Sequence, residues 1–150
     1  MTKDQFQEII NFAVEREREA QRFYNDAGAM ANWPHIRSLL NDLAKQEAGH
    51  ERYLLGLKMP TIQNAHIEPI PDMKISDYMV DMEYRADMEF QDIMVLAMKR
   101  EEKAVKLYEE LAGTCTDPNV CKLFAMMAEE EKKHKFNLEK EYEETVLQEN

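Results

Sequence analysis

Glycine and proline are scarce in this sequence, with four and five among 150 residues. Long segments run without either and are rich in Ala, Leu, Met, Glu, Lys and Arg. These residues favour helix, because they lose little side-chain freedom in it. The composition therefore predicts long helices, and the length suits one domain with a core of its own.

Long apolar runs are also missing. None approaches the roughly 18–20 residues that a helix needs to cross a bilayer. The polar segment Met1 to Glu8 lacks the apolar region of a signal peptide. We therefore expect a cytoplasmic protein without a membrane-spanning segment.

An excess of basic residues is absent as well. The formal net charge is −11, so no basic face is expected that could displace counterions from phosphates. The same charge disfavours docking to anionic lipid. The sequence thus argues against nucleic acid and membranes as partners.

The chain has only two cysteines, Cys115 and Cys121, which lie near an expected turn between helices. A disulfide between them is open in principle, but a reducing compartment favours two free thiols. The sequence has no Cys-x-x-Cys pair, which excludes a rubredoxin-type or zinc-ribbon iron site.

What the sequence does contain is an internal repeat. Residues 13–54 align without a gap on residues 97–138, at an offset of 84. The identical pairs include Ala13 and Ala97, Arg16 and Arg100, Glu17 and Glu101, Ala20 and Ala104, Tyr24 and Tyr108, Pro34 and Pro118, Leu39 and Leu123, Ala44 and Ala128, Glu47 and Glu131, His50 and His134, and Leu54 and Leu138. The repeat predicts two helical hairpins built on one plan.

Turn and capping residues place the expected helices at about 4–30, 34–58, 88–112 and 118–147. Pro34 and Pro118 suit the first helical turn, where a missing N–H costs nothing. Asp87 and Asp117 are expected as N-caps, and Gly113 is expected just beyond the third helix. The short turns within each half require antiparallel neighbours, whereas residues 59–86 are long enough for a crossover, with a short helix at 76–85. The predicted architecture is an all-α, ferritin-like antiparallel four-helix bundle with one long crossover.

Each expected helix carries a stripe of apolar residues at 4-3 spacing, which predicts its inward face. In the first two helices the stripes are Phe6, Ile10, Ala13, Glu17, Ala20, Tyr24 and Ala27, and Ile36, Leu40, Leu43, Glu47, His50, Leu54 and Leu57. In the last two they are Met94, Ala97, Glu101, Ala104, Tyr108 and Leu111, and Val120, Phe124, Met127, Glu131, His134 and Leu138. Every stripe is interrupted at its middle by a carboxylate, and two also by an imidazole.

Such a buried acidic cluster requires positive charge. Carboxylates that converge without a counterion repel one another, and burying each charge costs several kcal/mol. No stripe contains Lys or Arg at this level, whereas two divalent cations would balance four carboxylates. Each His follows a stripe Glu by three residues, so both face the same side. Oxygen and imidazole donors together favour iron, manganese or zinc over calcium.

These residues resemble the di-iron carboxylate proteins of the ferritin-like superfamily, in its rubrerythrin and bacterioferritin branch. The resemblance covers about residues 4–147. It implies that Glu47 and Glu131 bridge two irons, that Glu17 and His50 hold one, and that Glu101 and His134 hold the other. Tyr24 and Tyr108 would orient the carboxylates, or else serve as ordinary core aromatics.

The sequence departs from that branch in several places. Met98 stands where rubrerythrins carry an extra Glu, and no rubredoxin domain is present. Ala48 stands where bacterioferritin has its haem-ligating Met, so no haem is expected, and there is no room for the fifth helix of ferritin cages. Gln46 and Glu130, which precede the ligand Glu of their helices, are candidates to bond the N–H groups of the histidines.

The function that these residues favour is redox chemistry at two irons, with Mn or Zn as substitutes. The expected reaction is with H2O2 or O2, as a peroxidase or ferroxidase in oxidative-stress defence or iron handling. An external electron donor such as rubredoxin would then be needed, and a homodimer is expected. Three alternatives stay open: a non-catalytic iron-binding or delivery protein, a helical module with a structural zinc, and hydroxylation of an organic substrate.

Overall fold

The computed structural model describes residues 3–57, 84–85 and 87–147. Its main elements are four long helices: α1 (Lys3–Met30), α2 (Pro34–Leu55), α4 (Phe90–Thr114) and α5 (Pro118–Glu141). A π-helical segment, η2 (Tyr142–Leu147), continues from the end of α5. The predicted crossover and its short helix at 76–85 lie almost wholly outside the described residues.

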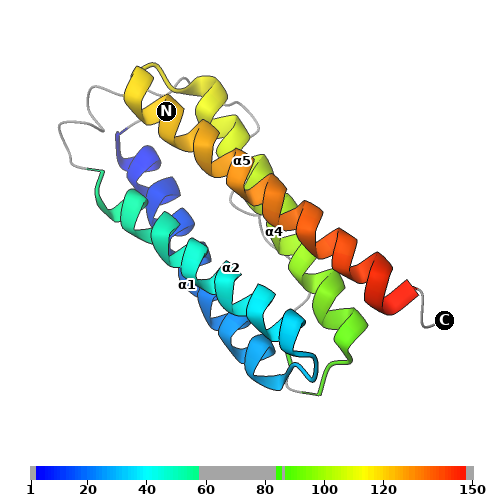
Figure 1. The fold of residues 1–150 in the computed structure, drawn as a ribbon. Helices are drawn as coiled ribbons and strands as arrows, with labels where there is room; N and C mark the ends of the chain where they lie inside the picture. Colours follow the sequence, from blue (N-terminus) through cyan, green and yellow to red (C-terminus); the bar gives the residue numbers. More distant parts are fainter. Residues whose placement is uncertain (1–2, 58–83, 86, 148–150) are drawn as a thin grey trace.

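The four helices form an antiparallel bundle of two hairpins (Figure 1). Helices α1 and α2 make one hairpin, and α4 and α5 the other. Helix α2 ends at one end of the bundle and α4 begins at the opposite end, so these two helices run in the same direction (Figure 1). The predicted all-α fold of ferritin-like topology is thereby confirmed, since this direction requires a long connection between the hairpins.

Two predicted boundaries were wrong by several residues. Helix α2 ends at Leu55 rather than near Lys58, because the N–H of Gly56 donates to the carbonyl of Arg52 at 3.0 Å and closes the last turn. Helix α4 begins at Phe90, and its N-cap is Glu89 rather than Asp87. The carboxylate of Asp87 lies 3.5 Å from Arg85 Nε instead.

The ends of the second hairpin also differ in detail from the prediction. Helix α4 continues through Gly113 to Thr114, whose hydroxyl donates to the carbonyl of Glu110 at 2.9 Å. The cap of α5 is as predicted: the carboxylate of Asp117 accepts hydrogen bonds from the backbone N–H groups of Asn119 and Val120. Two donors that the helix itself cannot satisfy are thereby bonded.

The core consists of two apolar clusters, one on each side of the bundle's middle. One contains Phe6, Ile10, Leu107, Leu111 and Phe124 among others. The other includes Phe23, Ile36, Leu40, Leu96 and Leu138. The predicted stripes are confirmed as inward faces, since all their members except the half-buried Leu57 are buried. The carboxylates and histidines occupy the level between the two clusters.

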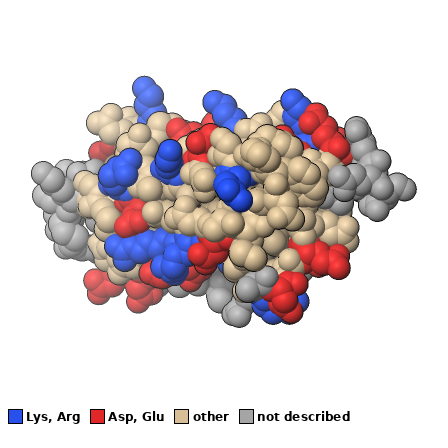
Figure 2. All heavy atoms as spheres, turned by 60° about the horizontal axis from the view of Figure 1, so that its bottom comes forward, with Lys and Arg blue, Asp and Glu red and all other residues tan. Residues whose placement is uncertain are grey.

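The surface carries charges of both signs. On the face that Figure 2 shows, Lys and Arg side chains lie among Asp and Glu. Lys132, for example, has carboxylate oxygens of Glu109 and Glu129 at 3.2 and 3.1 Å. None of the helices that the structure describes combines the length and the apolar character needed to cross a bilayer.

Candidate metal centre

Six polar side chains are buried at mid-bundle, each with at most 2% of its surface exposed. They come from all four helices: Glu17 from α1, Glu47 and His50 from α2, Glu101 from α4, and Glu131 and His134 from α5. Because each interrupts an apolar stripe, packing of the stripes brings the six together. The structure thus places all six predicted metal ligands in one dry cluster.

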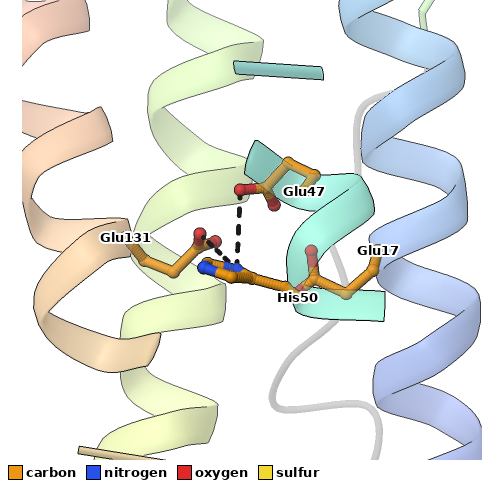
Figure 3. A group of neighbouring side chains, drawn as sticks. All are labelled: Glu17, Glu47, His50 and Glu131. Atoms are coloured by element: carbon orange, nitrogen blue, oxygen red, sulfur yellow. Dashed lines mark ion pairs between the residues drawn. The ribbon is translucent and has the colours of Figure 1, made fainter. Parts of the chain in front are cut away.

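Half of the cluster surrounds His50 (Figure 3). Its Nδ1 atom lies 3.1 Å from Glu131 Oε1, 3.6 Å from Glu17 Oε1 and 3.7 Å from Glu47 Oε1. One donor atom from each of these four residues lies within 4.8 Å of the others. Donors at such separations can share a single cation.

The other half surrounds His134 in the same way. Its Nδ1 atom lies 3.1 Å from Glu47 Oε1, 3.2 Å from Glu131 Oε1 and 3.6 Å from Glu101 Oε1. These four residues again bring donor atoms within 4.8 Å of one another. Glu47 and Glu131 belong to both groups, so the structure has the arrangement that two neighbouring ions with two bridging carboxylates require.

Unsatisfied donor atoms test whether metal ions fit. Among the described residues, eight buried side-chain N or O atoms lack a hydrogen-bond partner, and seven of them belong to these six residues. The seven are Glu17 Oε2, Glu47 Oε1, His50 Nδ1, Glu101 Oε2, both oxygens of Glu131, and His134 Nδ1. Buried polar atoms are rarely left unpaired. Their concentration at one place, with oxygen and imidazole donors, fits a pair of divalent cations.

The electrostatics of the cluster support the same conclusion. Burial, and then repulsion from neighbouring carboxylates, raises the pKa of Glu47 and of Glu131 well above the ordinary value. Burial would lower the pKa of both histidines, but contacts with Glu17 and Glu101 outweigh it and raise these pKa values to about 10. Without added cations, protons are thus needed to balance the cluster.

Two tyrosines fix the outer carboxylates. Tyr24 donates a short hydrogen bond to Glu101, and Tyr108 donates one of 2.5 Å to Glu17. Burial raises the pKa of both hydroxyls well above the ordinary value, so they remain protonated donors. Each bond joins one hairpin to the carboxylate of the other, and each leaves one oxygen of that carboxylate without a partner.

The Nε2 atoms of the two histidines, unlike the two outer carboxylates, contact different kinds of residue. His50 Nε2 contacts the carboxylate of Glu130, and His134 Nε2 lies 2.6 Å from Gln46 Oε1. Both partners are acceptors, so each Nε2 carries a proton and donates it. In the neutral imidazole, which is the form that binds a metal, the lone pair is then on Nδ1 and faces the carboxylates. One imidazole therefore has a charged partner and the other a neutral one.

Sequence reasoning missed two arginines beside the cluster. A small cavity lies against the carboxylates, and both Arg16 and Arg100 line it. The signal was the repeat itself, because these two residues occupy equivalent positions directly before Glu17 and Glu101. Both arginines lie next to a stripe position and not in a stripe, so their contribution to the cavity depends on the direction that each long side chain takes.

Other residues considered in the sequence lie away from the cluster. His35 is exposed, with its Nε2 atom 3.7 Å from Glu141. Cys115 and Cys121 are not joined by a disulfide, as predicted. His66 lies outside the described residues.

Comparison with known proteins adds evidence independent of this geometry. Residues 92–150 match the family model of rubrerythrin, a segment that includes Glu101, Glu131 and His134. No protein among the curated sequences matches the chain.

Two solved structures share the fold. One is a hypothetical protein from Pyrococcus furiosus, 24% identical with a TM-score of 0.68, in which the alignment covers 90% of this chain and 86% of the other. The second, from Thermotoga maritima, is named as a putative ferritin-like diiron-carboxylate protein; it is 21% identical with a TM-score of 0.71, over 92% and 94% of the two chains. These matches show that the chain has the ferritin-like fold, and that its segment 92–150 is similar to rubrerythrin.

Proposed function

We propose that this protein is a di-iron redox protein that reduces H2O2 or O2, as a peroxidase or a ferroxidase. The observation that carries the proposal is the convergence of seven unsatisfied, buried donor atoms in two groups that share Glu47 and Glu131. A pair of irons bound there would supply both electrons and Lewis acidity.

The residues of the chain would divide the work as follows. Glu17 and His50 would hold one iron and Glu101 and His134 the other, and Glu47 and Glu131, which belong to both donor groups, would serve both irons. Tyr24 and Tyr108 keep the terminal carboxylates in place through their hydrogen bonds. Glu130 and Gln46 orient the imidazoles by accepting their N–H protons. Supporting hydrogen bonds of this kind preorganise the ligands.

The size of the cavity favours a small substrate. Its volume is about 10 Å³, which is room for one water-sized molecule. Ala20, Ala104 and Leu107 contribute apolar walls. O2 and H2O2 are near this size, whereas an organic substrate for hydroxylation would need a much larger space.

Repeated turnover as a peroxidase would require an electron donor. These 150 residues contain no Cys-x-x-Cys pair, which a rubredoxin-type iron site needs. A separate donor such as rubredoxin would fill this role. The alternative, a non-catalytic iron carrier, would need the same ligands but no reductant.

Rapid mixing tests the proposal. The protein is loaded with two Fe(II) per chain without oxygen and then mixed with H2O2 or O2, and iron oxidation is followed by absorbance. We expect oxidation much faster than that of free Fe(II), and many cycles when a chemical reductant is added. The Glu131→Ala variant, which lacks a shared donor, should lose the fast phase. Oxidation no faster than in buffer, or release of Fe(II) to an acceptor without any oxidation, would contradict the redox role.

A further inference from the structure

The cavity beside the metal centre has a charged boundary with solvent. Ten residues line it, and eight of them are buried: Glu17, Ala20, Glu47, Glu101, Ala104, Leu107, Tyr108 and Glu131. The remaining two, Arg16 and Arg100, are half-buried. Among the lining residues, the two arginines are therefore the most exposed, and they lie between the cavity and solvent.

Neighbouring groups hold both side chains in place. Arg16 Nη2 donates to the backbone carbonyl of Arg100 at 3.2 Å. The guanidinium carbon of Arg16 lies 5.9 Å from the ring centroid of Phe12, and that of Arg100 lies 5.1 Å from the ring centroid of Phe23. Stacked and hydrogen-bonded guanidinium groups lose much of their freedom. Their charges are thus fixed at the entrance.

Arg100 has an unused donor at this entrance. Its Nε atom is buried and has no hydrogen-bond acceptor among the described residues. Arg16 lines the same cavity. Arg100 therefore offers a desolvated donor near a second cation.

Metal loading would change the balance of charge at this entrance. Four carboxylates lie behind the arginines, and two divalent ions would neutralise them. The attraction of Glu101 for Arg100 would then be largely cancelled, and two positive charges would remain at the entrance. This step rests on the proposed function.

We propose that Arg16 and Arg100 form a binding site for small monovalent anions at the entrance of the metal cavity. The ligand class comprises linear or planar anions of a few atoms, such as azide, cyanate and formate. One end of such an anion fits the cavity of about 10 Å³, and the rest lies against the guanidinium groups. Bulkier anions are excluded by the walls of Ala20, Ala104 and Leu107.

Calorimetric titration of azide tests this site without measuring turnover. The protein is loaded with iron, oxidised in air, and assayed for iron content before the titration. We expect Arg100→Gln and Arg16→Gln each to weaken azide binding roughly tenfold, the factor for one charge-assisted hydrogen bond, and the double variant more. Arg100→Lys should retain part of the affinity. The control is Arg22→Gln, which removes the same charge from α1. Arg22 is exposed and pairs with the exposed Glu15, so this variant should bind azide as the wild type does.

The iron assay separates failure of this proposal from failure of the proposed function. A wild-type protein that does not take up two irons would overturn both. Two irons per chain with equal azide affinity in the wild type and the double variant would overturn only the anion site. If Arg100→Gln binds iron poorly, the azide affinity of Arg16→Gln with two irons per chain is compared with that of the wild type instead. Equal affinities would then overturn the anion site.

Discussion

At the scale of single residues, the repeat has one functional asymmetry. Gln46 and Glu130 occupy equivalent positions, yet one contacts its histidine with an amide oxygen and the other with a carboxylate. A carboxylate partner makes an imidazole a stronger donor to a metal than an amide does. The two halves of the centre should therefore bind metal with unequal affinity, the His50 half more tightly.

Replacing Glu130 by Gln should weaken the tighter of the two binding steps by about tenfold or more, the usual effect of losing such a partner. Competition with a coloured chelator for Co(II) would measure both steps. The control is Glu129→Gln, an exposed neighbour on the same helix with the same change in charge. Unchanged binding in Glu130→Gln would show that the carboxylate does not act on the metal.

Cys115 should be an unreactive thiol. Burial and the neighbouring Cys121 raise its pKa to about 12, against a reference value of 9.0. Near neutral pH the thiolate is then about a thousandfold rarer than in an ordinary thiol, and its rate of alkylation should keep rising with pH up to the high pKa. Mass spectrometry of iodoacetamide labelling between pH 7 and 10 checks this. In guanidinium chloride, Cys115 should be labelled as fast as an ordinary thiol. Fast labelling of Cys115 in the folded protein at pH 7.5 would contradict the prediction.

The donor residues could be predicted from the sequence, because a Glu or His inside an apolar stripe must be buried once the stripe packs. Their grouping could not be derived from the stripes alone, since it depends on the distances between side-chain ends on different helices. The arginines at the cavity illustrate the same limit. Arg16 and Arg100 were visible as a repeated pair, but only the structure shows that both line the cavity beside the carboxylates.

At the scale of helices, the apolar stripes were predicted well but too narrowly. Ile9, Val14, Phe23, Leu96 and Leu107 are buried although they lie beside the 4-3 positions. Each helix of a four-helix bundle packs against two neighbours, so its buried face is wider than a single seam. The position of Asp87 was misjudged for a related reason. Aspartate is favoured as an N-cap by its own local hydrogen bonding, whereas the start of α4 also depends on the packing of Phe90 against Trp33. The centroids of these two rings lie 5.1 Å apart.

The cap of α5 makes a measurable prediction. Asp117→Ala removes the acceptor of two backbone N–H groups at the start of the helix, and we expect a loss of about 1 kcal/mol in the free energy of unfolding. Urea denaturation of the metal-free protein measures it. Asn119→Ala, at an exposed side chain in the same turn, should change stability much less. Equal effects of the two substitutions would exclude capping as the cause.

At the scale of the whole molecule, the buried cluster is a weak point that cations would repair. Four carboxylates in a dry core destabilise the fold unless their charge is balanced. The same residues therefore govern both metal binding and stability, and the connection can be measured by heating.

Metal should raise the melting temperature by about 5–10 °C for each site when free metal exceeds its Kd a hundredfold, since binding to the folded state alone adds about 2.7 kcal/mol. Differential scanning calorimetry with and without Fe(II) under argon, or with Zn(II), gives the value, and chelator should reverse the change. The Glu47→Gln variant loses a donor shared by both groups and should show a much smaller rise. A wild-type melting temperature that is insensitive to metal would argue against binding at this cluster.

The tyrosine and histidine contacts that run from one hairpin to the other have a consequence for the origin of the chain. Neither hairpin completes a ligand group by itself, because one group needs Glu131 from the second hairpin and the other needs Glu47 from the first. The supporting bonds of the tyrosines and histidines also run between the hairpins. Two copies of one hairpin, related by a twofold axis, would provide the same set of donors. The present chain is equivalent to such a symmetric dimer joined into one chain, and a single chain can carry a glutamate at one of two equivalent positions and a glutamine at the other.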